Sequence, residues 1–299
     1  MAANGPEKAR AVPLPARNPD LYARLREAVR RGGGGDDFFQ LGGAGRADKK
    51  NTGWQPWMGY ELNVEEKHCR LTVPFILRYT PLEGRTILDY GCGTGGLSVA
   101  LAAAGATVTG IEPSSGNHAL AGLRAAMYGL ERKTAFLHHR DTARLPFADN
   151  SFDLVIANSV LEYVLRNRRA HIREMFRVVN KGGLLCIIDT SNGLYPREVH
   201  SGRWFVNYLP RRAERLRCER GLRYREILTA LNGLNFLVMN STRSDEDLRW
   251  YYRRDGKPPS GGRRALYTVF FLLRHTLCRL LSLPVAALFP WLNIVLLKK

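Results

Sequence analysis

The chain of 299 residues has few cysteines, and none of them are closely spaced. Its five cysteines include no CxxC or CxxxC pair, the spacings that tetrahedral zinc sites use. An odd number of scattered cysteines is also unlike the disulfide framework of a small secreted protein. The first 20 residues lack the apolar run of a secretory signal. We therefore expect no metal site, no export and a reducing, cytoplasmic setting.

A long uninterrupted apolar run is also missing. The most apolar stretch, residues 265–297, contains no acidic side chain, but Arg274 and Arg279 interrupt it, and Pro284 and Pro290 would break a helix. A helix that spans a bilayer needs about 20 consecutive apolar residues, so a span is not expected. Two interpretations stay open: helices that cover a site as a lid, or amphipathic helices that lie on a membrane surface.

Acidic residues are in short supply, with 27 Asp and Glu against 45 Lys and Arg, which gives a net charge of +18. Residues 1–50 contribute +4, residues 51–200 contribute +2 and residues 201–299 contribute +12. Such an excess attracts nucleic acid, an anionic membrane surface or an acidic substrate. The hydrophobic fraction of 45% excludes a wholly disordered chain, and the glycines show no collagen period.

Short apolar runs alternate with helical stretches from residue 86 onward. Apolar runs of strand length separated by helices predict an α/β, doubly wound fold, in which helices cover both faces of a mainly parallel sheet. The predicted strands are 86–89, 107–112, 135–138, 154–157, 184–189, 235–239 and 293–297, and the predicted helices are 19–31, 96–104, 118–130, 172–179 and 225–231.

A glycine loop follows the first predicted strand and opens the next helix. Gly91, Gly93 and Gly96 match the GxGxxG pattern, in which backbone N–H groups at a helix N-terminus approach a ligand closely. Glu112 lies 21 residues after Gly91, where an acidic residue can bind ribose hydroxyls. These features fit NAD and other adenosine cofactors alike. Asp89 favours a cationic cofactor, because its charge would repel a pyrophosphate.

With these residues the sequence resembles the class I S-adenosylmethionine-dependent methyltransferases, in particular the broad small-molecule group, over residues 85–191. The resemblance rests on residues 89–95, on Glu112, on residues 141–147 and on residues 151–156 and 178–183. It implies a Rossmann-like methyltransferase fold with an antiparallel C-terminal strand, a helical C-terminal insertion and S-adenosyl-L-methionine as the cofactor. The implied cofactor-binding residues are Asp89, Gly91, Cys92, Gly93, Gly95, Glu112, Asp141, Thr142 and Asn158.

The composition and the pattern of apolar runs, together with the extent of the resemblance, divide the chain into four parts. Residues 1–50 are predicted as a flexible glycine-rich leader, residues 51–84 as an N-terminal helical cap and residues 85–191 as the cofactor-binding core. Residues 192–299 are predicted to hold the substrate loop, a basic and apolar helical insertion and the last strands. The chain departs from many relatives at Tyr163, where they carry a histidine, so no catalytic histidine is expected there.

Aromatic and basic side chains gather in residues 190–210, after the last parallel strand. Such a mixture indicates a loop that contacts substrate. His200 is the candidate catalytic base. The predicted substrate-binding residues are Tyr195, Arg197, Arg203 and Trp204. The alternative is that Trp204 and Phe205 anchor the loop by packing.

The sequence therefore predicts an enzyme that transfers a methyl group to oxygen or nitrogen of a small or lipid-linked acceptor. Seven arginines within residues 211–225 indicate phosphate recognition or a solvated helix face. Contact with an anionic membrane surface stays open, and nucleic acid ranks below a small or lipid-linked acceptor because no RNA-binding module is recognisable. The alternatives are an NAD-dependent oxidoreductase, an RNA methyltransferase and a non-catalytic, membrane-associated binding protein.

Overall fold

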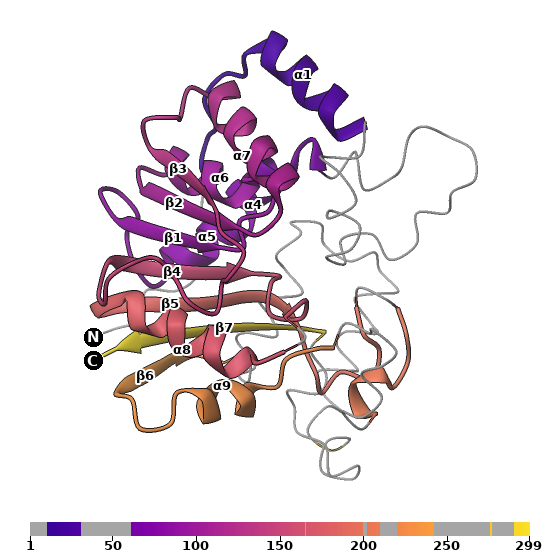
Figure 1. The fold of residues 1–299 in the computed structure, drawn as a ribbon, viewed down its shortest axis with the longest axis vertical. Helices are drawn as coiled ribbons and strands as arrows, with labels where there is room; N and C mark the ends of the chain where they lie inside the picture. The colour runs from indigo at the N-terminus through magenta and orange to yellow at the C-terminus, as the bar shows by residue number, and fades with distance from the viewer. Residues whose placement is uncertain are drawn as a thin grey trace.

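The computed structural model describes residues 11–30, 61–164, 166–199, 202–209, 220–241, 276 and 290–299. Within them, seven strands form one sheet in the order β3-β2-β1-β4-β5-β7-β6 (Figure 1). The strands are β1 Thr86–Tyr90, β2 Thr107–Glu112, β3 Thr134–His138, β4 Phe152–Asn158, β5 Val179–Ser191, β6 Phe236–Asn240 and β7 Trp291–Lys298. The first five strands pair in parallel, and β7 runs antiparallel to both β5 and β6. This confirms the predicted fold class, including the antiparallel C-terminal strand.

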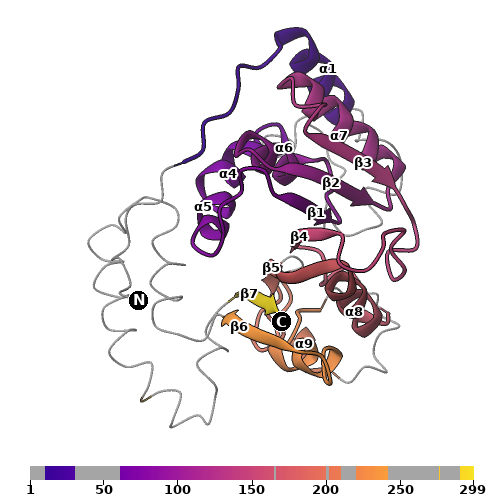
Figure 2. The ribbon, with the colours of Figure 1, turned by 90° about the vertical axis from the view of Figure 1, so that its left-hand side faces the viewer.

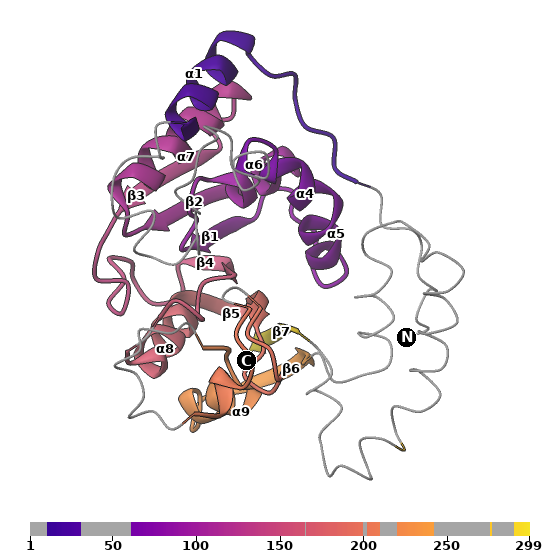
Figure 3. The same cartoon turned by 90° about the vertical axis from the view of Figure 1, so that its right-hand side faces the viewer.

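Helices cover both faces of the sheet, as Figures 2 and 3 show. The described helices are α1 Pro19–Arg30, α4 Val64–Arg70, α5 Thr72–Leu77, α6 Gly96–Ala103, α7 Ser115–Met127, α8 Arg168–Val178 and α9 Tyr224–Ala230, with a short 3-10 helix, η1, at Val206–Tyr208. Helices α1 and α4 to α7 lie on one side of the sheet, and α8 and α9 lie on the other.

Two apolar cores follow from the alternation of side chains along the strands. Ile87 of β1 and Ile156 of β4 lie in the core under α4 to α7. Their neighbours Leu88 and Val155 lie in the core under α8 and α9. Because both faces are buried, these strands are continuously apolar and do not alternate between apolar and polar residues.

The helix predicted in the leader is present as α1, and it packs onto the domain. Asn18 caps it, since its side-chain oxygen accepts hydrogen bonds from the backbone N–H groups of Asp20 and Leu21. Leu25 and Val29 are buried in the core beside α7.

The predicted C-terminal strand is confirmed as β7. Of the apolar stretch before it, residues 265–289, only Thr276 belongs to the described residues. Among the helices that the structure describes, none is long and apolar enough to cross a membrane.

Candidate active site

The carboxyl ends of the five parallel strands bring their loops to one edge of the sheet (Figure 1). The strand order reverses between β1 and β4, because the chain adds β2 and β3 on one side of β1 and β4 and β5 on the other. In open α/β sheets, ligands bind at such a reversal. The predicted cofactor residues lie at the ends of β1, β2 and β4 and after β3, so the fold collects them along this edge.

Three glycines after β1 have left-handed backbone conformations, with φ of +70° at Gly91, +55° at Gly93 and +81° at Gly95. A Cβ atom at Gly91 would lie 2.8 Å from Val160, and one at Gly95 would lie 2.9 Å from Ala121 of α7. A Cβ atom at Gly93 would meet no described atom within 4 Å. Gly93 therefore borders the open space in the loop, while its two neighbours are needed for packing.

Gly96 serves the packing of two helices. A Cβ atom there would collide with Cγ1 of Val64, so α6 approaches α4 this closely only with glycine at its first position. The third glycine of the pattern thus sets the distance between the N-terminal cap and the core.

Glu112 fastens the glycine loop to the end of β2. Its carboxylate accepts hydrogen bonds from the backbone N–H of Gly93 at 2.9 Å and of Ser114 at 3.0 Å, and from the Asn117 amide at 3.4 Å. Burial raises the pKa of Glu112, and these hydrogen bonds oppose that rise. The carboxylate of Glu112 is therefore bonded directly to the backbone of Gly93. The predicted hydrogen bond from a ribose hydroxyl to Glu112 stays a prediction.

Asp89 lies buried at the end of β1, where Ser98 of α6 donates a hydrogen bond of 2.6 Å to its carboxylate. The pKa of Asp89 is raised to about 7, mainly by burial and to a lesser extent by the charge of Glu112, while the hydrogen bonds to Ser98 oppose the rise. A buried carboxyl group that titrates near neutral pH is typical of a functional site.

Cys92 is buried within the glycine loop, and burial raises the pKa of its thiol well above the ordinary value. Its thiolate is therefore not available as a nucleophile. Its sulfur would lie 2.8 Å from a Cβ atom at Gly110, which shows how closely the loop packs on β2.

The loop after β3 carries Asp141, which is exposed, and Thr142. Tyr90, whose side chain is buried on the opposite face of β1 from Asp89, donates a hydrogen bond of 2.9 Å to the Thr142 carbonyl. The same hydroxyl lies 2.5 Å from Nδ1 of His171 on α8. Sequence analysis missed the role of Tyr90 and His171 in holding this loop, because the contact joins residues 81 apart.

Asn158, at the end of β4, has a buried side-chain oxygen with no hydrogen-bond partner among the described residues. Buried polar atoms nearly always have a partner, so an oxygen without one indicates a missing donor. The next residue, Ser159, is held in a left-handed conformation (φ +53°) by its hydrogen bonds to β5. The Asn158 oxygen is therefore able to accept a hydrogen bond from a ligand or a water molecule at this edge.

The predicted acceptor loop follows β5. The Arg197 guanidinium lies over the Trp204 ring at 6.0 Å and donates a hydrogen bond to the Gly202 carbonyl. Trp204 is 64% exposed and Phe205 is 60% exposed, so the interpretation of these rings as packing anchors is wrong. Tyr195 is half-buried, and Arg203 is exposed. His200 and residues 211–219 lie outside the described residues.

Two buried carboxyl groups beside this loop were missed from the sequence. Ser191, the last residue of β5, donates its hydroxyl proton to Glu198 at 3.0 Å and its N–H to Glu162 at 3.4 Å. Both carboxyl groups are fully buried. Their only sequence signal is a charged residue within an otherwise apolar or aromatic segment.

The segment that carries the glycine loop and the parallel strands matches a known protein family. Residues 88–187 match the family described as "Methyltransferase domain". The chain contains a class I S-adenosylmethionine-dependent methyltransferase domain. S-adenosylmethionine is therefore the cofactor of this domain, as the resemblance of its motifs implied.

Over the aligned segments, curated relatives are identical to this chain at about a third of the positions. The chain is 30% identical over 137 residues to a ubiquinone biosynthesis O-methyltransferase of Maricaulis maris, covering 45% of this chain and 53% of that protein. It is 36% identical over 116 residues to a demethylmenaquinone methyltransferase of Clavibacter sepedonicus, covering 39% and 45%. The chain thus spans about half the length of the curated relatives it matches.

One solved structure matches nearly the whole chain. The [4+2]-cyclase SpnF is 21% identical, with a TM-score of 0.51, and the match covers 96% of this chain and 98% of that one. At this identity the likeness concerns the fold alone. Since that protein is named as a cyclase, the fold does not by itself decide the reaction.

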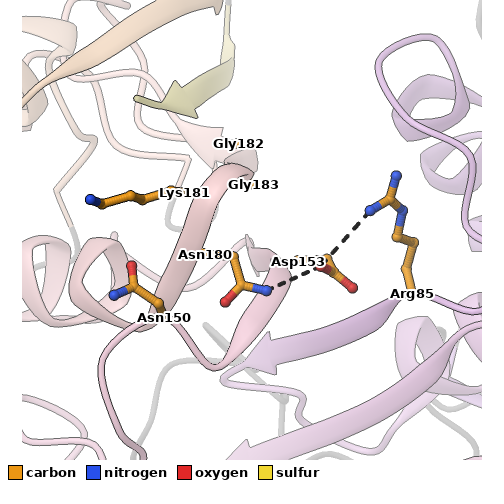
Figure 4. Close-up of a pocket in the computed structure, with 7 residues that line it drawn as sticks. All are labelled: Arg85, Asn150, Asp153, Asn180, Lys181, Gly182 and Gly183. Atoms are coloured by element: carbon orange, nitrogen blue, oxygen red, sulfur yellow. Dashed lines mark hydrogen bonds and ion pairs between the residues drawn. The ribbon is translucent and has the colours of Figure 1, made fainter.

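A polar cavity of about 390 Å³ lies at the amino ends of the parallel strands, at the opposite edge of the sheet from the glycine loop. It is lined by Arg85, Asn150, Asp153, Asn180, Lys181, Gly182 and Gly183 (Figure 4). Asp153 accepts hydrogen bonds there from the Thr86 N–H at 3.0 Å and the Asn180 amide at 3.1 Å, so it joins β1, β4 and β5. The cavity is separate from the cofactor residues of the methyltransferase domain. Among the described residues, no cluster of His, Cys, Asp or Glu is arranged to hold a metal ion.

Proposed function

We propose that this protein transfers the methyl group of S-adenosylmethionine to an oxygen or nitrogen atom of a small or lipid-linked acceptor. The observation that carries the proposal is the unpartnered, buried oxygen of Asn158 at the same edge as the open position at Gly93. Together they fit a ligand that carries a hydrogen-bond donor and lies against the glycine backbone.

The residues along this edge fit the cofactor from one end to the other. Asn158 would accept a hydrogen bond from the amino group of the methionine part, and Asp141 would accept one from the adenine amino group. Gly93 would lie against the sugar, next to Glu112. Bound S-adenosylmethionine supplies a methyl group activated by a sulfonium. The protein's task is to align that group with the acceptor and to exclude water, which supplies much of the acceleration of a displacement reaction.

The segment after β5 holds the candidate residues for binding and activating the acceptor. An acceptor hydroxyl usually needs a base within hydrogen-bond reach, and His200 is our candidate for it. Tyr195, Arg197, Arg203 and Trp204 are the candidate contacts. Two of the curated relatives are named as a ubiquinone biosynthesis O-methyltransferase and a demethylmenaquinone methyltransferase, which favours a quinone-like acceptor with an apolar tail.

Methyl transfer to defined acceptor pools tests this proposal. The purified chain is incubated with S-adenosylmethionine labelled with tritium in its methyl group and with a lipid extract, small aqueous metabolites or RNA. We expect label in the lipid extract or the small-molecule pool. Label in RNA alone would overturn the proposed acceptor class. No label in any pool, despite cofactor binding, would favour the non-catalytic alternative.

A further inference from the structure

Large apolar side chains gather on the surface of residues 202–209, which we call the aromatic loop. Trp204 is 64% exposed, Phe205 60%, Tyr208 46% and Leu209 43%. These are four of the nine exposed large hydrophobic residues within the described part of the chain, and they lie within six positions. Of the other five, Leu234, Leu237 and Met239 lie on or just before the edge strand β6, and Leu77 and Leu137 lie on α5 and β3. A concentrated apolar patch of this kind marks a contact surface.

The loop is built to hold these rings outward. Asn207 is buried and donates hydrogen bonds to the carbonyls of Asn192 and Tyr195, which fixes the base of the loop. Phe205 has a left-handed backbone (φ +60°), a conformation that is costly for a bulky residue, and its N–H donates to the Pro196 carbonyl at 2.6 Å. Such strain persists only where the surrounding structure enforces it.

The charges around the aromatic loop are positive. Arg197 and Arg203 are exposed on its rim, and Arg220 donates a hydrogen bond to the Leu209 carbonyl. The nearby carboxyl of Glu198 is fully buried, so it adds no acidic group to this surface. Residues 201–299 together carry +12. Exposed aromatic rings ringed by arginine complement the interface of a bilayer that contains anionic lipids.

We propose that the aromatic loop docks the protein on an anionic membrane, with Phe205 and Leu209 inserted at the level of the headgroups. The loop lies at the same side of the molecule as the carboxyl ends of the parallel strands (Figure 1). Docking therefore turns the candidate active site toward the bilayer. This rests on the proposed function in one respect: a lipid-linked acceptor would reach the site from the membrane.

Vesicle binding by the full chain tests the proposal. Sedimentation is compared for vesicles of phosphatidylcholine and for vesicles that also contain phosphatidylglycerol. We expect binding to the anionic vesicles that weakens as salt rises. The double variant Phe205→Ser/Leu209→Ser should bind at least about tenfold more weakly, since it removes two exposed apolar side chains that would insert at the level of the headgroups. The matched control is Leu237→Ser/Met239→Ser, which removes equally exposed residues from the edge strand β6 and should bind as the parent does.

Phe205→Gly separates docking from folding. Glycine adopts this backbone without strain, so the variant should melt at the same or a higher temperature and yet bind anionic vesicles more weakly. Affinity for S-adenosylhomocysteine should be unchanged in every variant, which keeps this test independent of the proposed activity. Two results would overturn the proposal: no preference for anionic vesicles, or equal binding by the parent and the Phe205→Ser/Leu209→Ser variant. A lowered melting temperature or a changed oligomeric mass with unaltered vesicle binding would instead assign the loop to contacts within or between chains.

Discussion

Arg124 of α7 and Glu65 of α4 form an ion pair in which both side chains are fully buried. Arg124 also donates hydrogen bonds to the Thr94 carbonyl at 2.9 Å and the Glu61 carbonyl at 2.7 Å. Tyr128 donates its hydroxyl proton to Glu65 at 2.7 Å. The pair thus joins the N-terminal cap, the glycine loop and α7, three segments that surround the candidate cofactor site.

Removing one partner of this pair should be costly. Arg124→Met removes the buried cation of Glu65 and leaves only the more distant, partly exposed Arg17 at 3.6 Å, so we expect the free energy of unfolding to fall by about 3 kcal/mol. Urea unfolding measures the loss. Arg132→Met, which alters an exposed arginine, should change it by about 0.5 kcal/mol or less. An Arg124→Met loss as small as that of the control would show that the pair contributes little.

Gly96 and Gly122 form a matched pair for testing the contact between α4 and α6. Gly96→Ala places a methyl group against Val64 and should destabilise the fold by about 1–3 kcal/mol. At Gly122, in α7, a Cβ atom would meet no described atom within 4 Å, so Gly122→Ala should stabilise the fold by about 0.5–1 kcal/mol. Thermal unfolding of both variants gives the comparison. Val64→Ala should partly rescue Gly96→Ala, and equal effects of the two alanines would contradict the close approach.

Asp89 should make stability depend on pH. Its pKa is about 7 in the folded protein and about 4 in the unfolded chain, so between these values only the unfolded chain releases the proton. The stability of the parent relative to Asp89→Asn should therefore fall as pH rises from about 4 to 7 and then level off. His68 titrates in an overlapping window, because burial first and then the charges of Lys67 and Arg124 lower its pKa to about 3. Since both proteins contain His68, the difference between their urea midpoints isolates Asp89. A difference that stays constant or grows with pH would exclude the raised pKa.

The open position at Gly93 should be needed for the ligand. Gly93→Ala should lower affinity for S-adenosylhomocysteine at least about tenfold, because its methyl group enters the space that the cofactor needs. Gly129→Ala is the control: φ is +65° there and its Cβ atom would also meet no described atom within 4 Å, but it lies at the end of α7. Both variants should lose about 1 kcal/mol of stability from backbone strain. Equal affinities would mean that Gly93 does not border the cofactor.

The order and type of the elements were predictable because the apolar runs are short and regular. The strand predicted at residues 107–112 is β2, Thr107–Glu112, and the other predicted strands and helices agree with the structure apart from their ends. The largest difference is in β5, which was predicted at residues 184–189 but begins at Val179. Val179 pairs with Phe152 of β4, and a register shift separates this pair from the rest of the strand. Local patterns do not reveal such irregular pairing.

The places of the candidate site residues in the fold were predictable where a local motif carries them. The glycines, Glu112 and Asn158 lie at strand ends that the pattern of strands and helices already identifies. The buried pair of Arg124 and Glu65 was not predictable, since 59 residues separate its members and charged residues on helices are usually exposed. Glu162 and Glu198 were not predicted either, because only the folded chain buries both carboxyl groups beside Ser191.

Calorimetric titration of the purified chain with S-adenosylmethionine, S-adenosylhomocysteine and NAD tests the central claim most directly. We predict one site that binds both sulfur-containing ligands and no measurable binding of NAD. We also predict weaker binding of both ligands by Asn158→Leu, whose side chain accepts no hydrogen bond. Binding of NAD without binding of either sulfur-containing ligand would contradict the account.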